Sequence, residues 1–108
     1  MTGAILAQVR PADTNAVSAY STPKGTRAEI TRVLVCNTTG NTPSFRIFLD
    51  NDGSTYDQTT ALYYDKAMSA NDTTTIEGSW WIDDSGNLAV RTSAGNELTF
   101  TVFGAEFQ

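Results

Sequence analysis

The stretch Ala28–Asn37 restricts the possible folds more than any other part of the chain. Its first half alternates apolar and polar residues, and Val33–Cys36 is apolar on both faces of an extended chain. A β-branched segment that is apolar on both faces is typical of a strand in the middle of a sheet whose two sides are covered. Residues 37–43 contain Asn, Gly and Pro, which favour a chain reversal. The next segment, Ser44–Asp50, alternates again, so we expect the two segments to form a hairpin.

The other extended segments are short, and no stretch keeps a helical apolar period over three turns. Strands with turn residues at intervals of about 8–12 residues are typical of an antiparallel sandwich or barrel. We therefore expect an all-β chain of about eight strands that forms an antiparallel two-sheet β-sandwich, with the jelly roll as one form of it. The last two strands are expected to pair with each other, and the full connectivity does not follow from the sequence. The further predicted strands are Ala4–Val9, Ala16–Ser21, Ala61–Ala67, Thr73–Ile82 (one strand or two, interrupted near Gly78), Asn87–Thr92 and Glu97–Phe103.

The length of the chain predicts one domain over residues 1–108, because 108 residues with 40% hydrophobic content support a single core and not two. Within it, residues 1–15 are either an N-terminal arm with Pro11 as a stiff joint or an ordinary edge strand. Cys36 is the single cysteine and has no internal disulfide partner. It lies in the most apolar run, so we expect a buried thiol that packs as a small hydrophobe.

The charge and the N-terminal sequence exclude several kinds of partner. The net charge is −5 and the seven Lys and Arg residues are scattered, whereas nucleic-acid affinity rests on a basic surface. Residues 1–10 lack the basic and long apolar regions of a signal peptide. No segment approaches the roughly 20 apolar residues of a membrane span. We expect a protein made in a cytoplasm that binds neither nucleic acid nor membrane.

The sequence contains no histidine, which removes the commonest general acid–base group and the usual ligand of transition metals. Asp83 and Asp84 lie in a turn beside glycine, where Asp serves backbone geometry. Residues 50–54 resemble part of a calcium loop, but Phe48 and Thr59 stand where that loop needs its first and last ligands. We expect no catalytic residue, no metal site and no cofactor, with a weak calcium site of another kind left open.

Two pairs of adjacent aromatic residues must each divide between the two faces of a strand, because neighbouring side chains point to opposite sides. If no bulge intervenes near Gly78, Trp80 and Tyr64 point inward, while Trp81 and Tyr63 point outward. Outward aromatics are either scattered exposure or part of a contact surface. The candidate protein-contact residues on outward positions are Phe48, Tyr63, Trp81 and Phe103.

The same aromatics have a second interpretation, in which Trp81 and Tyr63 are the stacking platforms of a carbohydrate-binding module. Sugar sites also need polar partners in a fixed geometry. Here the neighbours are mainly Thr, Ser and Asp. We therefore expect that the protein does not bind sugar.

Three segments carry a resemblance to a known family. Ala19–Ile30, followed by Val35–Thr39, and the C-terminal run Leu98–Glu106 resemble small β-sandwich structural proteins of tailed bacteriophage virions. Such proteins decorate or cement capsids, or belong to head fibres and tails. The family has no catalytic motif, so the resemblance assigns no functional residue.

The resemblance implies a non-enzymatic virion structural protein at the capsid surface, made in the host cytoplasm. We expect a capsid decoration or cement protein that stabilises the head, and a tail or neck component is the alternative. The resemblance also implies two kinds of partner. One is the chain itself in a homotrimer or another small ring, and the other is the major capsid protein or another virion protein.

Overall fold

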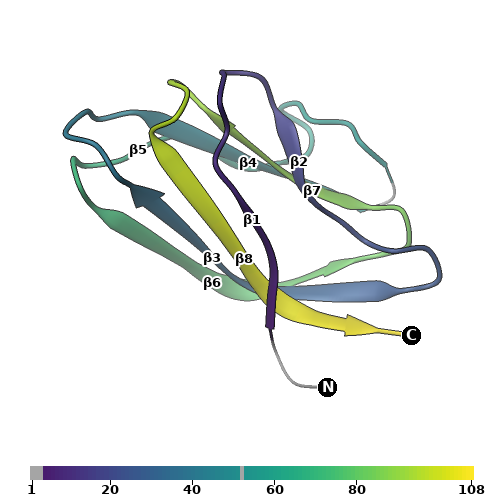
Figure 1. The fold of residues 1–108 in the computed structure, drawn as a ribbon. Helices are drawn as coiled ribbons and strands as arrows, with labels where there is room; N and C mark the ends of the chain where they lie inside the picture. The colour runs from purple at the N-terminus through teal and green to yellow at the C-terminus, as the bar shows by residue number, and fades with distance from the viewer. Residues whose placement is uncertain (1–3, 52) are drawn as a thin grey trace.

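The computed structural model describes residues 4–51 and 53–108, which form eight strands in two antiparallel four-stranded sheets (Figure 1). The all-β, two-sheet prediction is confirmed. We call the two layers the β3 sheet and the β4 sheet. The β3 sheet has the order β1 (Ala4–Val9), β8 (Leu98–Phe107), β3 (Arg27–Asn37) and β6 (Thr73–Ile82). The β4 sheet has the order β2 (Val17–Ser21), β7 (Asn87–Thr92), β4 (Ser44–Asp50) and β5 (Ala61–Ala67).

The strands pair from the ends of the chain toward its middle. β1 lies beside β8, β2 beside β7, β3 beside β6 and β4 beside β5. Of the eight described strands, β4 and β5 are the one consecutive pair that shares a sheet. The predicted hairpin of β3 with β4 and the predicted pairing of β7 with β8 are therefore wrong. The turn residues do reverse the chain there, but each returning strand joins the opposite sheet.

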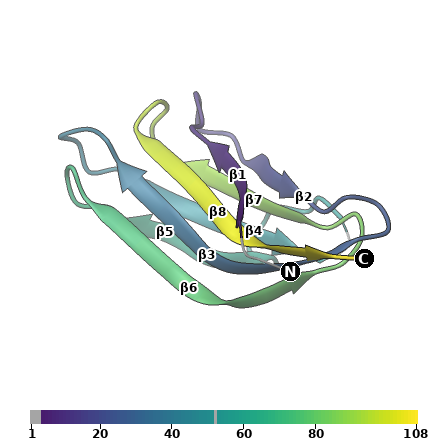
Figure 2. The ribbon, with the colours of Figure 1, turned by 60° about the horizontal axis from the view of Figure 1, so that its bottom comes forward.

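The core lies between the two sheets, which form two layers, one in front of the other in Figure 2. Rings from opposite sheets meet in it, with Phe45 and Phe100 at 6.0 Å between centroids in an edge-to-face arrangement. Burial of each such side chain contributes roughly 1.5–3 kcal/mol of hydrophobic free energy. The other fully buried core side chains of the strands are Ile30, Val35, Ile47, Ile82, Leu88, Val90, Leu98 and Val102.

The strand β3 does lie inside its sheet, between β8 and β6. Its pairing register shifts relative to both neighbours between Ile30 and Arg32, which restarts the alternation of its buried residues. The expectation that both sides of β3 are covered is wrong for the outer side. Leu34 and Cys36 are only half-buried there, because their neighbours on β6 and β8 are threonines and no second layer covers them.

The N-terminal segment follows the edge-strand alternative as far as it is described. Residues 4–9 form β1 at the edge of the β3 sheet. The residues after β1 are hydrogen-bonded to β7 and to the loop that follows it. The Pro11 carbonyl accepts from the Asn96 N–H at 2.8 Å, and the Thr14 carbonyl accepts from Arg91 Nε at 2.6 Å. The rest of the predicted arm, residues 1–3, lies outside the described residues.

Candidate contact surfaces

The outer faces of the two sheets are where a partner can meet this protein, because the inner faces form the shared core. Of the four aromatic residues expected on contact positions, Trp81 and Phe103 belong to the β3 sheet and Phe48 and Tyr63 to the β4 sheet. The four side chains differ in exposure, from the buried Phe48 to the exposed Trp81.

Phe48 is buried, with 2% of its surface exposed, so the expectation of an exposed ring is wrong. The ring lies 6.3 Å from that of Tyr56, which belongs to the long connection between β4 and β5. The connection is tied back to β4 where the Leu49 N–H donates to the Thr60 carbonyl at 2.8 Å. Alternation along β4 does not reveal that a later loop covers this ring.

The orientations expected for Tyr63 and Tyr64 are reversed. Tyr63 pairs across the sheet with the buried Ile47 and packs against the core, 6.1 Å from the ring of Phe45. Tyr64 is 42% exposed. Cross-strand partners share a face, so the register with β4 decides which tyrosine is buried. The apolar Leu62, two residues before Tyr64 on the same strand, is exposed as well.

Trp80 and Trp81 point as predicted. Trp80 packs against the core and Trp81 is 42% exposed. The register between β3 and β6 shifts beside Gly78, yet the inward and outward sides of β6 stay as predicted. The reason is that β3 changes its own alternation at the same place, between Ile30 and Arg32. A Cβ on Gly78 would lie 2.7 Å from the Trp80 ring, so the indole needs glycine at that position to lie flat on β6.

The exposed Trp81 ring is held by its neighbours on the outer face of the β3 sheet. Its centroid lies 5.4 Å from that of Phe107, and Arg27 Cζ lies 5.0 Å from the ring. The Arg27 guanidinium also pairs with Asp83 at 3.0 Å. An exposed cation–π contact contributes about 0.5–1 kcal/mol and an exposed ion pair less. We call Arg27, Trp81, Asp83 and Phe107 the Trp81 cluster.

A second apolar area lies on the same face. Ile5 is 60% exposed and pairs across the sheet with the half-buried Phe103. Both side chains border an open hollow that Gly78 and the ion pair of Arg32 with Glu77 also line. Ile5 and Phe107 were not among the predicted contact residues. If the last predicted strand had continued past Phe103, the alternation of side chains would have placed Phe107 on the same face as Phe103.

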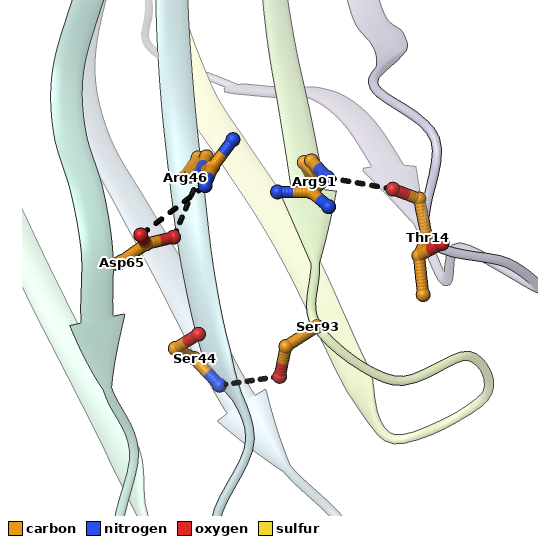
Figure 3. A network of polar contacts seen from close by, with 6 residues as sticks. All are labelled: Thr14, Ser44, Arg46, Asp65, Arg91 and Ser93. Carbon is orange, nitrogen blue, oxygen red and sulfur yellow. Dashed lines mark hydrogen bonds and ion pairs between the residues drawn. The ribbon is translucent and has the colours of Figure 1, made fainter.

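The outer face of the β4 sheet carries a polar network instead (Figure 3). Arg46 on β4 donates to both carboxylate oxygens of Asp65 on β5, at 2.6 and 3.1 Å, and its Cζ lies 3.8 Å from the ring centroid of Tyr64. On the neighbouring strand β7, Arg91 reaches the Thr14 carbonyl. The hydrogen bonds from Arg46 lower the pKa of Asp65, and the Asp65 carboxylate in turn raises the pKa of Arg46.

The remaining carboxylates with shifted pKa values serve turns. Asp57 accepts from the Thr59 hydroxyl and backbone N–H, and these bonds lower its pKa. Asp84 accepts from the Gly25 N–H at 2.8 Å, which lowers its pKa as well. Within residues 4–51 and 53–108, no three Asp, Glu or Cys side chains lie close enough to hold a metal ion together. The described part of the chain also holds no helix long and apolar enough to cross a membrane.

The fold is thus an eight-stranded β-sandwich in which both sheets expose a few large apolar side chains, Ile5 and Trp81 on the β3 sheet and Val17, Leu62 and Tyr64 on the β4 sheet. The sequence matches no protein-family model and no curated protein. Among solved structures, the chain is similar to one in the "acidic stable capsid structure of Helicobacter pylori bacteriophage KHP30". The likeness covers 100% of this chain and 94% of the other, with a TM-score of 0.59 and 10% sequence identity. At that identity, the likeness is one of fold.

Proposed function

We propose that this chain is a non-enzymatic structural protein of a bacteriophage virion. The observation that carries the proposal is the strand order. The first strand pairs with the last and the two middle strands with each other, which is the order of a jelly roll. Jelly rolls are common in viral capsid domains. The fold likeness to a chain of a bacteriophage capsid, over the whole length of this protein, supports the same proposal.

Within that class, we propose a capsid decoration or cement protein on the head surface, with a tail or neck component as the alternative. Such a protein needs a stiff domain and an exposed area that docks to a repeated lattice. The outer face of the β3 sheet offers this area, with the Trp81 cluster and the pair of Ile5 and Phe103. Its partners are other copies of the chain, as a homotrimer or another small ring, and the major capsid protein.

The size of the exposed apolar surface favours many weak contacts over one strong contact. A buried Trp removes about 150–250 Å² from water, and Trp81 has 42% of its surface left to bury. At about 25 cal/mol per Å² this amounts to on the order of 2 kcal/mol. Association costs at least about 4 kcal/mol of rigid-body freedom. One ring is therefore insufficient, and several copies in a symmetric ring act together at high effective concentration.

Immunogold labelling of purified particles tests the location. Head labelling is expected, tail labelling would replace the decoration proposal by the tail alternative, and unlabelled particles would remove the virion proposal. A second comparison uses heads with and without this protein. Heads that carry it should survive heating or chelation longer if it acts as cement, and equal survival would contradict that role.

A further inference from the structure

We propose that a hollow on the outer face of the β4 sheet binds a neutral carbohydrate ring. This inference goes beyond the structural role proposed above and does not depend on it. The hollow is an open depression of about 430 Å³, a volume within the size range of small-ligand sites. We call it the tyrosine hollow, and its lining consists of Arg46, Phe48, Tyr56, Asp57, Gln58, Thr59 and Tyr64.

Two tyrosine rings supply the apolar part of the hollow. Tyr64 is exposed, and the Arg46 guanidinium lies 3.8 Å from its ring centroid. The half-buried Tyr56 packs against Phe48 at 6.3 Å. Each ring is thus held by a neighbour. A sugar ring has an apolar C–H face that packs on an aromatic ring, and phenol hydroxyls can exchange hydrogen bonds with its polar edge.

Polar side chains at the rim can meet the sugar hydroxyls, which both donate and accept hydrogen bonds. Asp57 is fixed by the Thr59 N–H at 2.8 Å and the Thr59 hydroxyl at 2.5 Å, and its lowered pKa keeps it an ionised acceptor. The exposed Gln58 adds an amide that both donates and accepts. The rim therefore offers both kinds of group, beside an aromatic floor.

The backbone beneath the hollow departs from regular sheet geometry in a way that positions Tyr64. Between Phe45 and Ile47 the register shifts, so that Tyr64 and Asp65 together lie opposite Arg46. Asp65 has a φ of 57°, a left-handed conformation that is unfavourable for a residue with a side chain. Bulges and strained residues of this kind are enriched beside functional sites. Here the bulge brings the Asp65 carboxylate onto Arg46, which in turn lies against the Tyr64 ring.

Charge selects the class of sugar. Arg46 is already paired with Asp65, so it adds no free positive charge to the hollow. With Arg46 paired to Asp65, the remaining charged side chain of the lining is the carboxylate of Asp57, and the whole chain carries −5. Phosphorylated and carboxylated sugars are disfavoured by these charges, whereas a neutral hexose is not. This proposal departs from the expectation of no sugar binding, which was argued from the outward aromatics Trp81 and Tyr63, and neither of these residues lines the hollow.

The test is an NMR titration of the ¹⁵N-labelled full chain. The probes are the methyl glycosides of glucose, galactose, mannose and N-acetylglucosamine, with N-acetylneuraminic acid as the charged comparison. Taken to about 10 mM, they reveal a site with a dissociation constant near 1 mM. At least one neutral glycoside should shift amide resonances of residues 56–59 and 64.

Variants assign the shifts to the hollow. Tyr64→Ala and Gln58→Ala should each weaken binding about tenfold or more, and both positions are exposed, so the fold should persist. Trp81→Ala is the matched control on the opposite sheet and should bind like the natural chain. The proposal is overturned if no neutral glycoside shifts these resonances, if the charged sugar binds tighter, or if only Trp81→Ala weakens binding. Immunogold labelling is unaffected by any of these results, so the two proposals fail separately.

Discussion

The two outer faces differ in how they treat one aromatic ring each, because Trp81 is open on the β3 sheet and Phe48 is covered on the β4 sheet, although Leu62 and Tyr64 of the β4 sheet are exposed. Ile5 and Trp81 remain exposed on the first face. On the second, Phe48 lies beneath the β4–β5 connection, and the exposed Tyr64 is held against Arg46. The strands of both faces alternate in the same way, so alternation does not explain the contrast.

The connections explain it. Every connection other than that between β4 and β5 passes from one sheet to the other, across an end of the sandwich (Figures 1 and 2). The β4–β5 connection stays on its own sheet and is long enough to fold back over the outer face. Among the described residues, the outer face of the β3 sheet stays open because no connection returns across it.

The largest expected effect is that of Phe48→Ala. Removing a buried phenylalanine should lower the free energy of unfolding by about 3–5 kcal/mol, although the ring lies outside the main core. The matched variant Phe103→Ala, on the uncovered face, should cost clearly less. Urea unfolding of both variants measures the difference. Equal losses would mean that the loop does not shield Phe48 in solution.

The adjacent tryptophans give the next effect. Trp80→Ala should lower the free energy of unfolding by about 3 kcal/mol, at the low end for core aromatics because Trp80 is only partly buried. Trp81→Ala should cost less than about 1 kcal/mol, since its ring contacts are exposed. Thermal melting of the two isolated variants side by side decides this. If Trp81→Ala lowers the melting temperature as much as Trp80→Ala, the outward assignment of Trp81 fails.

Self-association should depend on the open face alone. We expect light scattering at high protein concentration to report a homotrimer or another small ring. Trp81→Ala removes the exposed surface of the ring, which is worth on the order of 2 kcal/mol per contact, so it should weaken each contact about 30-fold. Ile5→Asp should act in the same direction, and Tyr64→Ala on the other face should leave the mass unchanged. A monomer mass for the natural chain would remove the prediction.

The smallest effect concerns pH. The pKa values of Asp57, Asp65 and Asp84 are lowered in the folded chain, so their stabilising contribution is complete above the ordinary Asp pKa of about 4. This contribution to the free energy of unfolding is lost as the pH falls through the lowered pKa values of the folded state. With no histidine, the free energy of unfolding should stay level between about pH 5 and 8.

Urea unfolding across this pH range measures the curve. Asp65→Asn should remove part of the acid-side loss, since an amide does not titrate, and Asp13→Asn on an exposed loop is the matched control. A loss of stability between pH 6 and 7 in the natural chain would contradict this account of its charges.

Local sequence patterns were sufficient to predict where most of the strands begin and end. The segments at residues 4–9, 44–50, 61–67, 73–82 and 87–92 begin and end where the alternation and the turn residues indicate. These are properties of neighbouring residues, so a sequence holds them. Trp80 and Trp81 were assigned correctly for the same reason, because Ile76 and Ile82 mark the inward side of that strand.

The tertiary structure alone decided which strands pair and which outward residues are covered. Turn residues 38–43 and 93–97 reverse the chain equally well whether the next strand returns to its own sheet or crosses to the other. Tyr63 is buried because the register with β4 aligns it with Ile47, and Phe48 because a distant loop segment packs over it. Alternation determines the two sides of a strand, whereas pairing and exposure depend on residues far along the chain.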